Sequence, residues 1–183
     1  MMISQSQTLA LITQYVPQSE EEEVFQQQML DLVRQAPDFA SRHRPEAHLT
    51  ASAWVVNTAR NACLLLHHQK LDRWLQPGGH IEPQDRSLAE AARREVNEET
   101  GLQELILLLD GQIVDLDIHL IPASGKMAAH WHYDLRFAFE APNPPALVQN
   151  QESKALGWLS AEEIFLRAPG EASMTRMVQK MLI

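Results

Sequence analysis

The sequence predicts one α/β or α+β domain whose sheet is covered by helices on both faces. Helical patterns occupy the first forty residues and the C-terminal end, and strand patterns fill the middle around one internal helix. The segments 113–120 and 130–139 alternate apolar and polar residues with the period of two that is typical of half-buried strands. With 183 residues, 45% of them hydrophobic, the chain can build one packed core with a small appendage.

Residues 1–45 are expected to form a helical extension that packs on a main domain spanning residues 46–183. Ser19 followed by Glu22 is a capping-box pattern, and an apolar stripe runs from Val24 to Val33 behind it. A shorter helix precedes this one and ends near Pro17. Packing against a sheet edge is the more frequent arrangement of such an extension, and a lid or the contact of a homodimer is the alternative.

The main domain is expected to hold most of the strands and one long internal helix. Strands are predicted at 48–57, 62–67, 73–76, 105–109, 113–120, 130–139 and 158–159, with 105–109 buried. The internal helix runs over 87–100 and ends at Gly101, where a left-handed cap is common. Ser160 and Glu163 form a second capping box, and a terminal helix with methionines along one side follows it.

The composition limits the classes of partner. A net charge of −9, from 15 basic and 24 acidic residues, argues against a long nucleic acid, which needs clustered Lys and Arg. It does not exclude a small phosphorylated ligand that a divalent cation bridges. No apolar run exceeds five residues and the first residues carry no secretory pattern, so we expect a cytoplasmic protein without a membrane helix. The single cysteine, Cys63, is read as a small buried hydrophobe.

Three carboxylates crowd the end of the internal helix. Glu95 and Glu99 lie one turn apart on the same face, with Glu98 beside them. A pair of like charges at ~4 Å costs about 4 kcal/mol at an effective dielectric near 20. In a cleft this repulsion requires a cation, and oxygen ligands favour Mg²⁺ or Mn²⁺. Composition alone favours the alternative of an ordinary solvated helix.

The longer string of residues changes that balance, because residues 79–102 resemble the Nudix box, Gly-x5-Glu-x7-Arg-Glu-U-x-Glu-Glu-x-Gly-U, where U is a bulky aliphatic residue. The matching positions are Gly79, Arg94, Glu95, Val96, Glu98, Glu99, Gly101 and Leu102. Asp85 replaces the expected Glu, and eight residues instead of seven separate it from Arg94. A role for Asp85 as a helix cap or as a ligand through water stays open.

The resemblance implies a Nudix-like α/β/α sandwich with a mixed sheet that hydrolyses a small nucleoside-diphosphate derivative. It implies that Glu95 and Glu99 bind Mg²⁺ or Mn²⁺, that Glu98 does so directly or through water, and that a carbonyl at Gly79 contributes. Arg94 would orient the carboxylates. Either Glu95 or the loop residue Glu152 would be the general base, and for Glu152 a plain solvated glutamate is an equal alternative.

A polar face of the late strands is the second candidate feature. If 113–120 and 130–139 pair, their polar residues share one side, namely Asp115, Asp117, His119, His130, His132, Asp134 and Arg136. One hypothesis is that His130, His132, Asp134 and Arg136 contact the substrate, and His119, His130 and His132 are candidates for a further metal. A plain solvent face is the favoured alternative.

Two other functions share the resemblance. A catalytically weak Nudix-fold sensor would bind a ligand without cleaving it, but such proteins usually have a broken box. Isopentenyl-diphosphate isomerase has the same fold, and the surroundings of Cys63 do not match its catalytic cysteine. The identity of the substrate cannot be read from the sequence.

Overall fold

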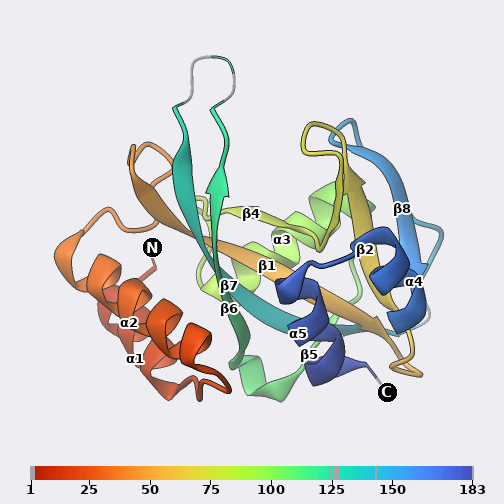
Figure 1. Cartoon of the computed structure of the whole chain (residues 1–183), viewed down its shortest axis with the longest axis horizontal. Helices are drawn as coiled ribbons and strands as arrows, with labels where there is room; N and C mark the ends of the chain where they lie inside the picture. The colour runs from red at the N-terminus through yellow and green to blue at the C-terminus, as the bar shows by residue number, and fades with distance from the viewer. Residues whose placement is uncertain (1–2, 124, 126–127, 143, 183) are drawn as a thin grey trace.

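The computed structural model describes residues 3–123, 125, 128–142 and 144–182. In these residues one mixed sheet forms the centre of the molecule (Figure 1). Its strands are β1 (Ala47–Asn57), β2 (Cys63–His68), β3 (Arg73–Leu75), β4 (Gly78–His80), β5 (Ile106–Leu107), β6 (Ile113–Ile121), β7 (His130–Ala141) and β8 (Ser153–Leu159).

The strand β1 organises the sheet. It runs parallel to β7 along its whole length, from the pair Ala47–Trp131 to the pair Asn57–Ala141. It also pairs antiparallel with β4, where Thr50 faces His80, and with β2. The strand β6 returns antiparallel on β7, and together they form the long hairpin that projects from the molecule in Figure 1. Residues far apart in the sequence therefore meet at one end of β1.

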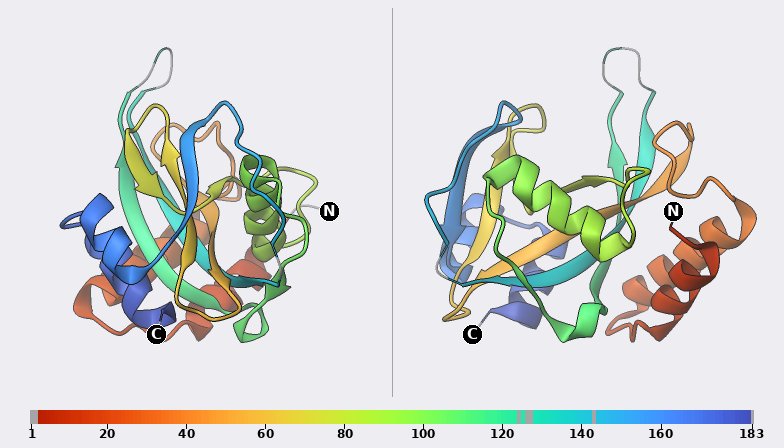
Figure 2. Two further views of the ribbon diagram at one scale, coloured as in Figure 1. Left: turned by 90° about the vertical axis from the view of Figure 1, so that its right-hand side faces the viewer. Right: turned by 180° about the vertical axis from the view of Figure 1, so that it is seen from behind.

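Helices cover both faces of the sheet (Figure 2). The helices are α1 (Gln5–Gln14), α2 (Glu20–Gln35), α3 (Leu88–Thr100), α4 (Ala161–Arg167) and α5 (Ala172–Met181). One face packs on α3 and, towards the hairpin, on α1 and α2, while the other packs on α4 and α5. The expected α/β/α arrangement with a mixed sheet and N-terminal helices is confirmed.

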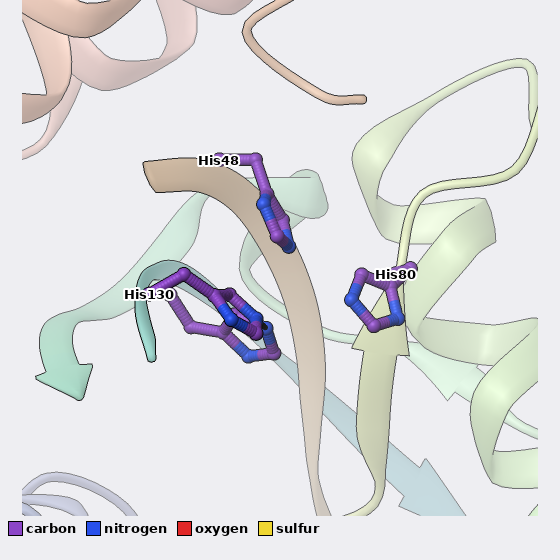
Figure 3. A group of neighbouring side chains, drawn as sticks. His48, His80 and His130 are labelled. Atoms are coloured by element: carbon purple, nitrogen blue, oxygen red, sulfur yellow. Dashed lines mark hydrogen bonds between the residues drawn. The ribbon is translucent and has the colours of Figure 1, made fainter. Parts of the chain in front are cut away.

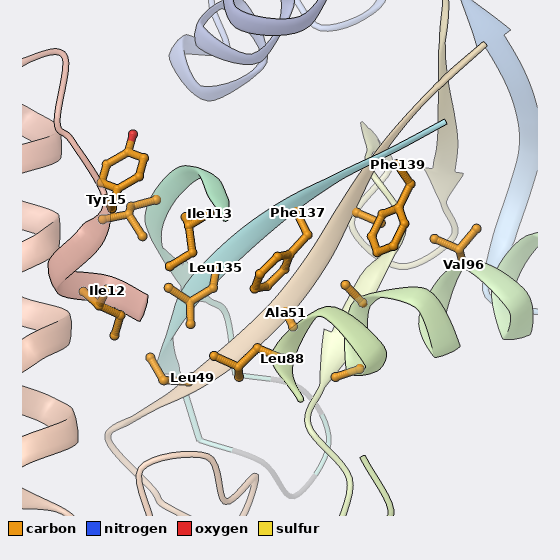
Figure 4. Close-up of a cluster of buried hydrophobic side chains, with 14 of the residues drawn as sticks. Ile12, Tyr15, Leu49, Ala51, Leu88, Val96, Ile113, Leu135, Phe137 and Phe139 are labelled. Atoms are coloured by element: carbon orange, nitrogen blue, oxygen red, sulfur yellow. The ribbon is translucent and has the colours of Figure 1, made fainter. Parts of the chain in front are cut away.

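Alternate residues of β1 serve the two cores. Leu49, Ala51 and Val55 join the cluster under α3, which Figure 4 shows extending to Ile12 of α1. Trp54 points to the opposite cluster, beneath α4 and α5. Both clusters bury bulky aliphatic and aromatic side chains, and this burial is the main source of the free energy that holds the layers together.

Three local expectations need correction. The run 105–109 is not a buried strand, because only β5 pairs there, at the edge of β7, and Ile106 is 50% exposed. Ser19 caps α2, but the Glu22 carboxylate accepts hydrogen bonds from the Tyr15 hydroxyl and the Gln18 amide, so the capping box is only half formed. Val24 is half-exposed and lies outside the buried stripe of α2.

Other local expectations are confirmed. Gly101 ends α3 with φ +75°, and Ser160 with Glu163 forms the full capping box of α4. Cys63 is fully buried, which raises the pKa of its thiol. No helix in the described part of the chain has both the length and the apolar character needed to cross a bilayer.

Candidate active site

Two glycines let β4 approach its neighbours closely. A Cβ on Gly78 would lie 2.3 Å from the Cβ of Ser52 on β1. A Cβ on Gly79 would lie 2.7 Å from Oε1 of Glu95 on α3. Because glycine has no side chain, β4 fits between β1 and α3, and the backbone of Gly79 lies against a glutamate carboxylate.

The three glutamates of α3 differ in exposure. Glu99 is 5% exposed, and its Oε2 accepts a hydrogen bond of 3.0 Å from the backbone N–H of Gly78. The side chain of Glu95 is mostly buried, whereas that of Glu98 is 55% exposed. The predicted helix therefore turns two carboxylates towards β4 and leaves the third at the rim.

Positive charge is scarce around the two inner carboxylates: Glu95 contacts Arg94, and within the described residues Glu99 forms no ion pair. Burial raises the pKa of Glu99 to about 8; the Gly78 hydrogen bond opposes this, and the negative charges of Glu95 and Glu152 add to it. Burial also raises the pKa of Glu95, and the Arg94 guanidinium only partly opposes it. A cation beside these oxygens would favour the ionised carboxylates and so lower their pKa values.

Arg94 holds the rim of this cluster together. It donates to both oxygens of Asp85 at 3.0 and 3.1 Å, to Glu95 at 2.9 Å, to Glu98 at 3.1 Å and to the carbonyl of His80 at 2.7 Å. Burial disfavours the charged guanidinium, but the bonds to Asp85 and Glu95 outweigh it and raise the pKa of Arg94. The guanidinium thereby ties α3 to β4.

The place of Asp85 follows from this contact. It is buried, and it accepts hydrogen bonds from the Glu82 amide and from Arg94. It does not cap the helix, because Ser87 does so by accepting from the Glu90 amide at 3.1 Å. Asp85 therefore anchors Arg94 rather than the helix end.

Glu152 comes close to the cluster from the loop before β8. Asn150 Nδ2 donates to the Glu98 carbonyl at 3.4 Å, and the Val148 amide donates to the Thr100 carbonyl at 2.9 Å, so the loop follows the end of α3. Glu152 is exposed, and its charge contributes to the raised pKa values of Glu95 and Glu99. The structure thus brings together Gly79, Arg94, Glu95, Glu98 and Glu99, and the loop that carries Glu152 runs along the end of the same helix.

The polar face of β6 and β7 is largely buried, so the favoured expectation of a solvent face is wrong for its inner part. The two strands pair as expected, with Asp115 opposite Arg136 and Asp117 opposite Asp134. Arg136 is 2% exposed, and its guanidinium contacts Asp115, Asp117 and Asp134 within 3.0 to 3.3 Å. The remaining contact of Arg136, with the Ser173 hydroxyl, belongs to α5.

Helices α2 and α5 complete this buried network, which the sequence did not reveal. Arg176 and Lys180 of α5 contact Asp115 at 3.3 and 2.7 Å, and Lys180 also contacts Glu22 of α2 at 3.0 Å. Asp134 accepts from the hydroxyls of Thr50 and Ser52. We therefore assign Asp134 and Arg136 to the support of the sheet, since a substrate contact would have to break these ion pairs.

His130 and His132 lie farther along the same face and have two unexpected neighbours. His48 is the direct partner of His132 in the β1–β7 pair, and His80 follows from the β1–β4 pair. His119 lies outside this group, with its Nδ1 3.0 Å from Asp117. The sequence pattern grouped His119 with His130 and His132, whereas His48 and His80 stand in separate segments that only the sheet brings together.

Comparison with known proteins identifies the family. The family model for the NUDIX domain matches residues 46–181. The chain belongs to the Nudix hydrolase family. Two solved structures show the same fold. A C. elegans Ap4A hydrolase complex is 21% identical, with a TM-score of 0.57 over 72% of this chain and 93% of that one. The E. coli dihydroneopterin triphosphate pyrophosphohydrolase is 17% identical, with a TM-score of 0.54 over 73% and 94%.

The residues present fit the divalent cation that Nudix hydrolases use. Glu99 is buried and the side chain of Glu95 is mostly buried, and the Cβ-free backbone of Gly79 lies beside the Glu95 carboxylate. Hard oxygen donors of this kind suit Mg²⁺ and Mn²⁺. Burial disfavours the ionised form of Glu99, which is why its pKa is raised, and a bound cation would stabilise that ionised form.

Proposed function

We propose that this Nudix hydrolase cleaves the diphosphate linkage of a small nucleoside-diphosphate derivative, with Mg²⁺ or Mn²⁺ held by Glu95, Glu99 and the backbone of Gly79. The observation that carries the proposal is that the buried Glu99 and the mostly buried Glu95 lie against β4 with raised pKa values, which the positive charge of Arg94 does not offset. When bound, the cation neutralises the diphosphate and lowers the pKa of a bound water.

The protein's own residues supply orientation and proton transfer. Arg94 fixes the carboxylates of Glu95 and Glu98 through its hydrogen bonds. Glu98, at the rim, is a further ligand directly or through water. Glu152 is the general base that we favour over Glu95, because an exposed carboxylate on a loop is free to take a proton from water while Glu95 binds the cation.

The test is a screen for hydrolysis in the presence of Mg²⁺. It covers nucleoside triphosphates, nucleotide sugars, dinucleoside polyphosphates such as Ap4A, and dihydroneopterin triphosphate, with products identified by chromatography. We expect turnover of at least one diphosphate-containing class, and a loss of at least about 100-fold in Glu99→Gln, since removing a metal ligand forfeits several kcal/mol of transition-state stabilisation.

Glu90→Gln is the matched control, because Glu90 lies on the same helix but is exposed, and its carboxylate accepts a hydrogen bond from the Arg86 amide. It should keep full activity. Equal turnover by folded Glu99→Gln would refute the metal assignment. Binding without turnover in the parent protein would favour a ligand-binding Nudix protein instead.

A further inference from the structure

Four histidines from three strands converge at the end of the sheet. His48 comes from β1, His80 from β4, and His130 and His132 from β7. One ring nitrogen of each lies within 4.8 Å of those of the others. Figure 3 shows the rings of His48, His80 and His130 directed towards one another from their separate strands. This convergence uses none of the carboxylates of the proposed catalytic cluster.

The contacts around the rings of His48 and His130 occupy the Nδ1 atoms and leave the Nε2 atoms to face the middle of the group, where Nε2 of His130 lies within hydrogen-bond distance of Nε2 of His132. Nδ1 of His48 lies 3.4 Å from the Arg44 carbonyl, and Nδ1 of His130 lies 2.9 Å from the Ala128 carbonyl. Each contact places the proton on Nδ1 and the lone pair on Nε2. Backbone carbonyls hold metal-binding histidines in this way, by accepting the N–H that faces away from the ion.

Two of the inward nitrogens have no partner. Nε2 of His48 and Nε2 of His80 are buried and make no hydrogen bond within the described residues. His48 is fully buried, so water does not reach it from the surface. A buried polar atom without a partner costs about 1–3 kcal/mol, and two such atoms facing the same point indicate a missing ligand.

We propose that His48, His80, His130 and His132 bind a divalent transition-metal ion, and that Zn²⁺ is the ion this set fits best. Imidazole nitrogens suit Zn²⁺ and its neighbours rather than Mg²⁺, which prefers oxygen. With Zn–N bonds of 2.0–2.1 Å, tetrahedral ligand nitrogens stand about 3.3 Å apart. Nε2 of His130 and Nε2 of His132 are 3.2 Å apart, close to this spacing; without an ion the two atoms share a hydrogen bond, whose proton an ion would displace.

The electrostatic surroundings are compatible with a dication. Burial lowers the pKa of His80, with Arg42 adding to the effect, and burial lowers the pKa of His132, with His119 adding to it. Arg42 and Arg94, whose positive charges act on His80, are each paired with a carboxylate: Arg42 with Glu82 at 3.6 Å, and Arg94 with Asp85 at 3.0 Å.

This site is separate from the proposed Mg²⁺ site, although β4 joins them. Gly79 is paired with Ala51 and faces α3, whereas His80 is paired with Thr50 and faces the other side of the sheet. The carbonyl of His80 accepts from Arg94 at 2.7 Å. An ion at the four histidines would therefore link β4 to β1 and β7 and stabilise the position of Gly79 from the face of the sheet opposite α3.

The experiment uses untagged full-length protein, stripped with a chelator and dialysed into excess Mg²⁺ so that the glutamates do not compete for Zn²⁺. Zn²⁺ is titrated by calorimetry, and Co²⁺ is titrated by visible absorption. We expect one tight equivalent of Zn²⁺, strong visible bands from tetrahedral Co²⁺, and a rise in melting temperature of several degrees on adding Zn²⁺.

His132→Gln and His48→Gln should each weaken Zn²⁺ binding at least about tenfold and abolish the rise in melting temperature. His43→Gln, at an exposed histidine, and Glu99→Gln should both keep the full equivalent. Retention of tight Zn²⁺ binding by folded His132→Gln would overturn the proposal, as would the absence of Zn²⁺ binding by the parent protein. Neither result would affect the hydrolysis test, which depends on Glu99.

Discussion

Buried carboxylates occur in two clusters, and the clusters differ in the origin of the positive charge beside them. In the network under α5, the single residue Asp115 contacts three cationic side chains, those of Arg136, Arg176 and Lys180. Beside β4, Glu95 contacts Arg94, and within the described residues Glu99 has no cationic side chain within 4.0 Å. The first cluster is neutralised by the chain itself, and the second is not.

The pKa values follow this difference. Burial acts to raise the pKa of Asp117, but Arg136 and His119 outweigh it and hold that pKa well below its usual range. Burial also acts to raise the pKa of Glu22, but the hydrogen bonds of Glu22 with Tyr15 and Lys180 outweigh burial, so the pKa of Glu22 is lowered. Burial instead raises the pKa of Glu99 to about 8. The same desolvation therefore has opposite outcomes, which separates a structural ion network from a site that needs an external cation.

Removing one charge from the network should have the largest effect on stability. Arg136→Met leaves Asp134 buried without the guanidinium beside it and leaves Asp117 with one guanidinium, that of Arg176, instead of two, so we expect the free energy of unfolding to fall by roughly 3–5 kcal/mol. Urea denaturation measures this. Arg34→Met, at an exposed pair with Asp31, should change stability by less than about 0.5 kcal/mol.

The milder variant Asp134→Asn tests the same network if Arg136→Met does not fold. It removes one carboxylate and keeps a side chain that can bond to Thr50 and Ser52. A loss smaller than that of Arg136→Met, with unchanged Mg²⁺ affinity, is expected. A stability equal to that of the parent protein in both variants would show that the network does not hold the sheet and α5 together.

Glu152→Gln examines the exposed member of the uncompensated cluster. If Glu152 is the general base, kcat should fall about 100-fold, equivalent to ~2.7 kcal/mol, while Mg²⁺ affinity changes little. The acidic limb of the pH–rate profile should be lost together with the base. Glu162→Gln, at an exposed glutamate in the first turn of α4, is the control and should behave as the parent protein. An unchanged pH profile in Glu152→Gln would assign the base to Glu95.

The sequence predicted features encoded over short distances. The spacing from Arg94 to Gly101 places the carboxylates on one face of a helix, and the alternation of β6 and β7 predicts their shared polar face. Burial of that face by Arg176 and Lys180 depends on α5, some forty residues later, so it leaves no local pattern. His48 and His132 meet through a parallel pair 84 residues apart in the chain, and the register of such pairs is fixed only by the complete sheet.

Glu99→Gln should raise the stability of the metal-free protein, the reverse of the change at Arg136. A folded-state pKa near 8, above the ordinary 4.5, means that the folded protein favours protonated Glu99. The contribution of protonated Glu99 to the free energy of unfolding is complete below pH 4.5 and is lost as the pH rises towards 8. At pH 8 in EDTA, the free energy of unfolding of Glu99→Gln should therefore be about 2 kcal/mol higher than that of the parent protein.

The pH dependence provides the control for this experiment. In EDTA the parent protein should lose stability between pH 5 and pH 8, and Glu99→Gln should lose less. Saturating Mg²⁺ should stabilise the parent protein and leave the variant unchanged. A variant that is less stable than the parent at pH 8 without metal would mean that the Glu99 carboxylate is compensated within the chain, and the contrast between the two clusters would fail.

Gly79→Ala should have the smallest effect, and it separates cation affinity from stability. The added Cβ would meet Oε1 of Glu95 at 2.7 Å, and because this atom ends a flexible side chain, the carboxylate should move while the fold persists. We expect Mg²⁺ affinity to fall roughly tenfold, about 1.4 kcal/mol, with a nearly unchanged melting temperature in EDTA. Gly157→Ala on β8, where a Cβ meets only Leu159 at 3.4 Å, should alter neither quantity. If Gly79→Ala instead lowered stability and kept Mg²⁺ affinity, Gly79 would serve strand packing, and the ligands would lie elsewhere on α3.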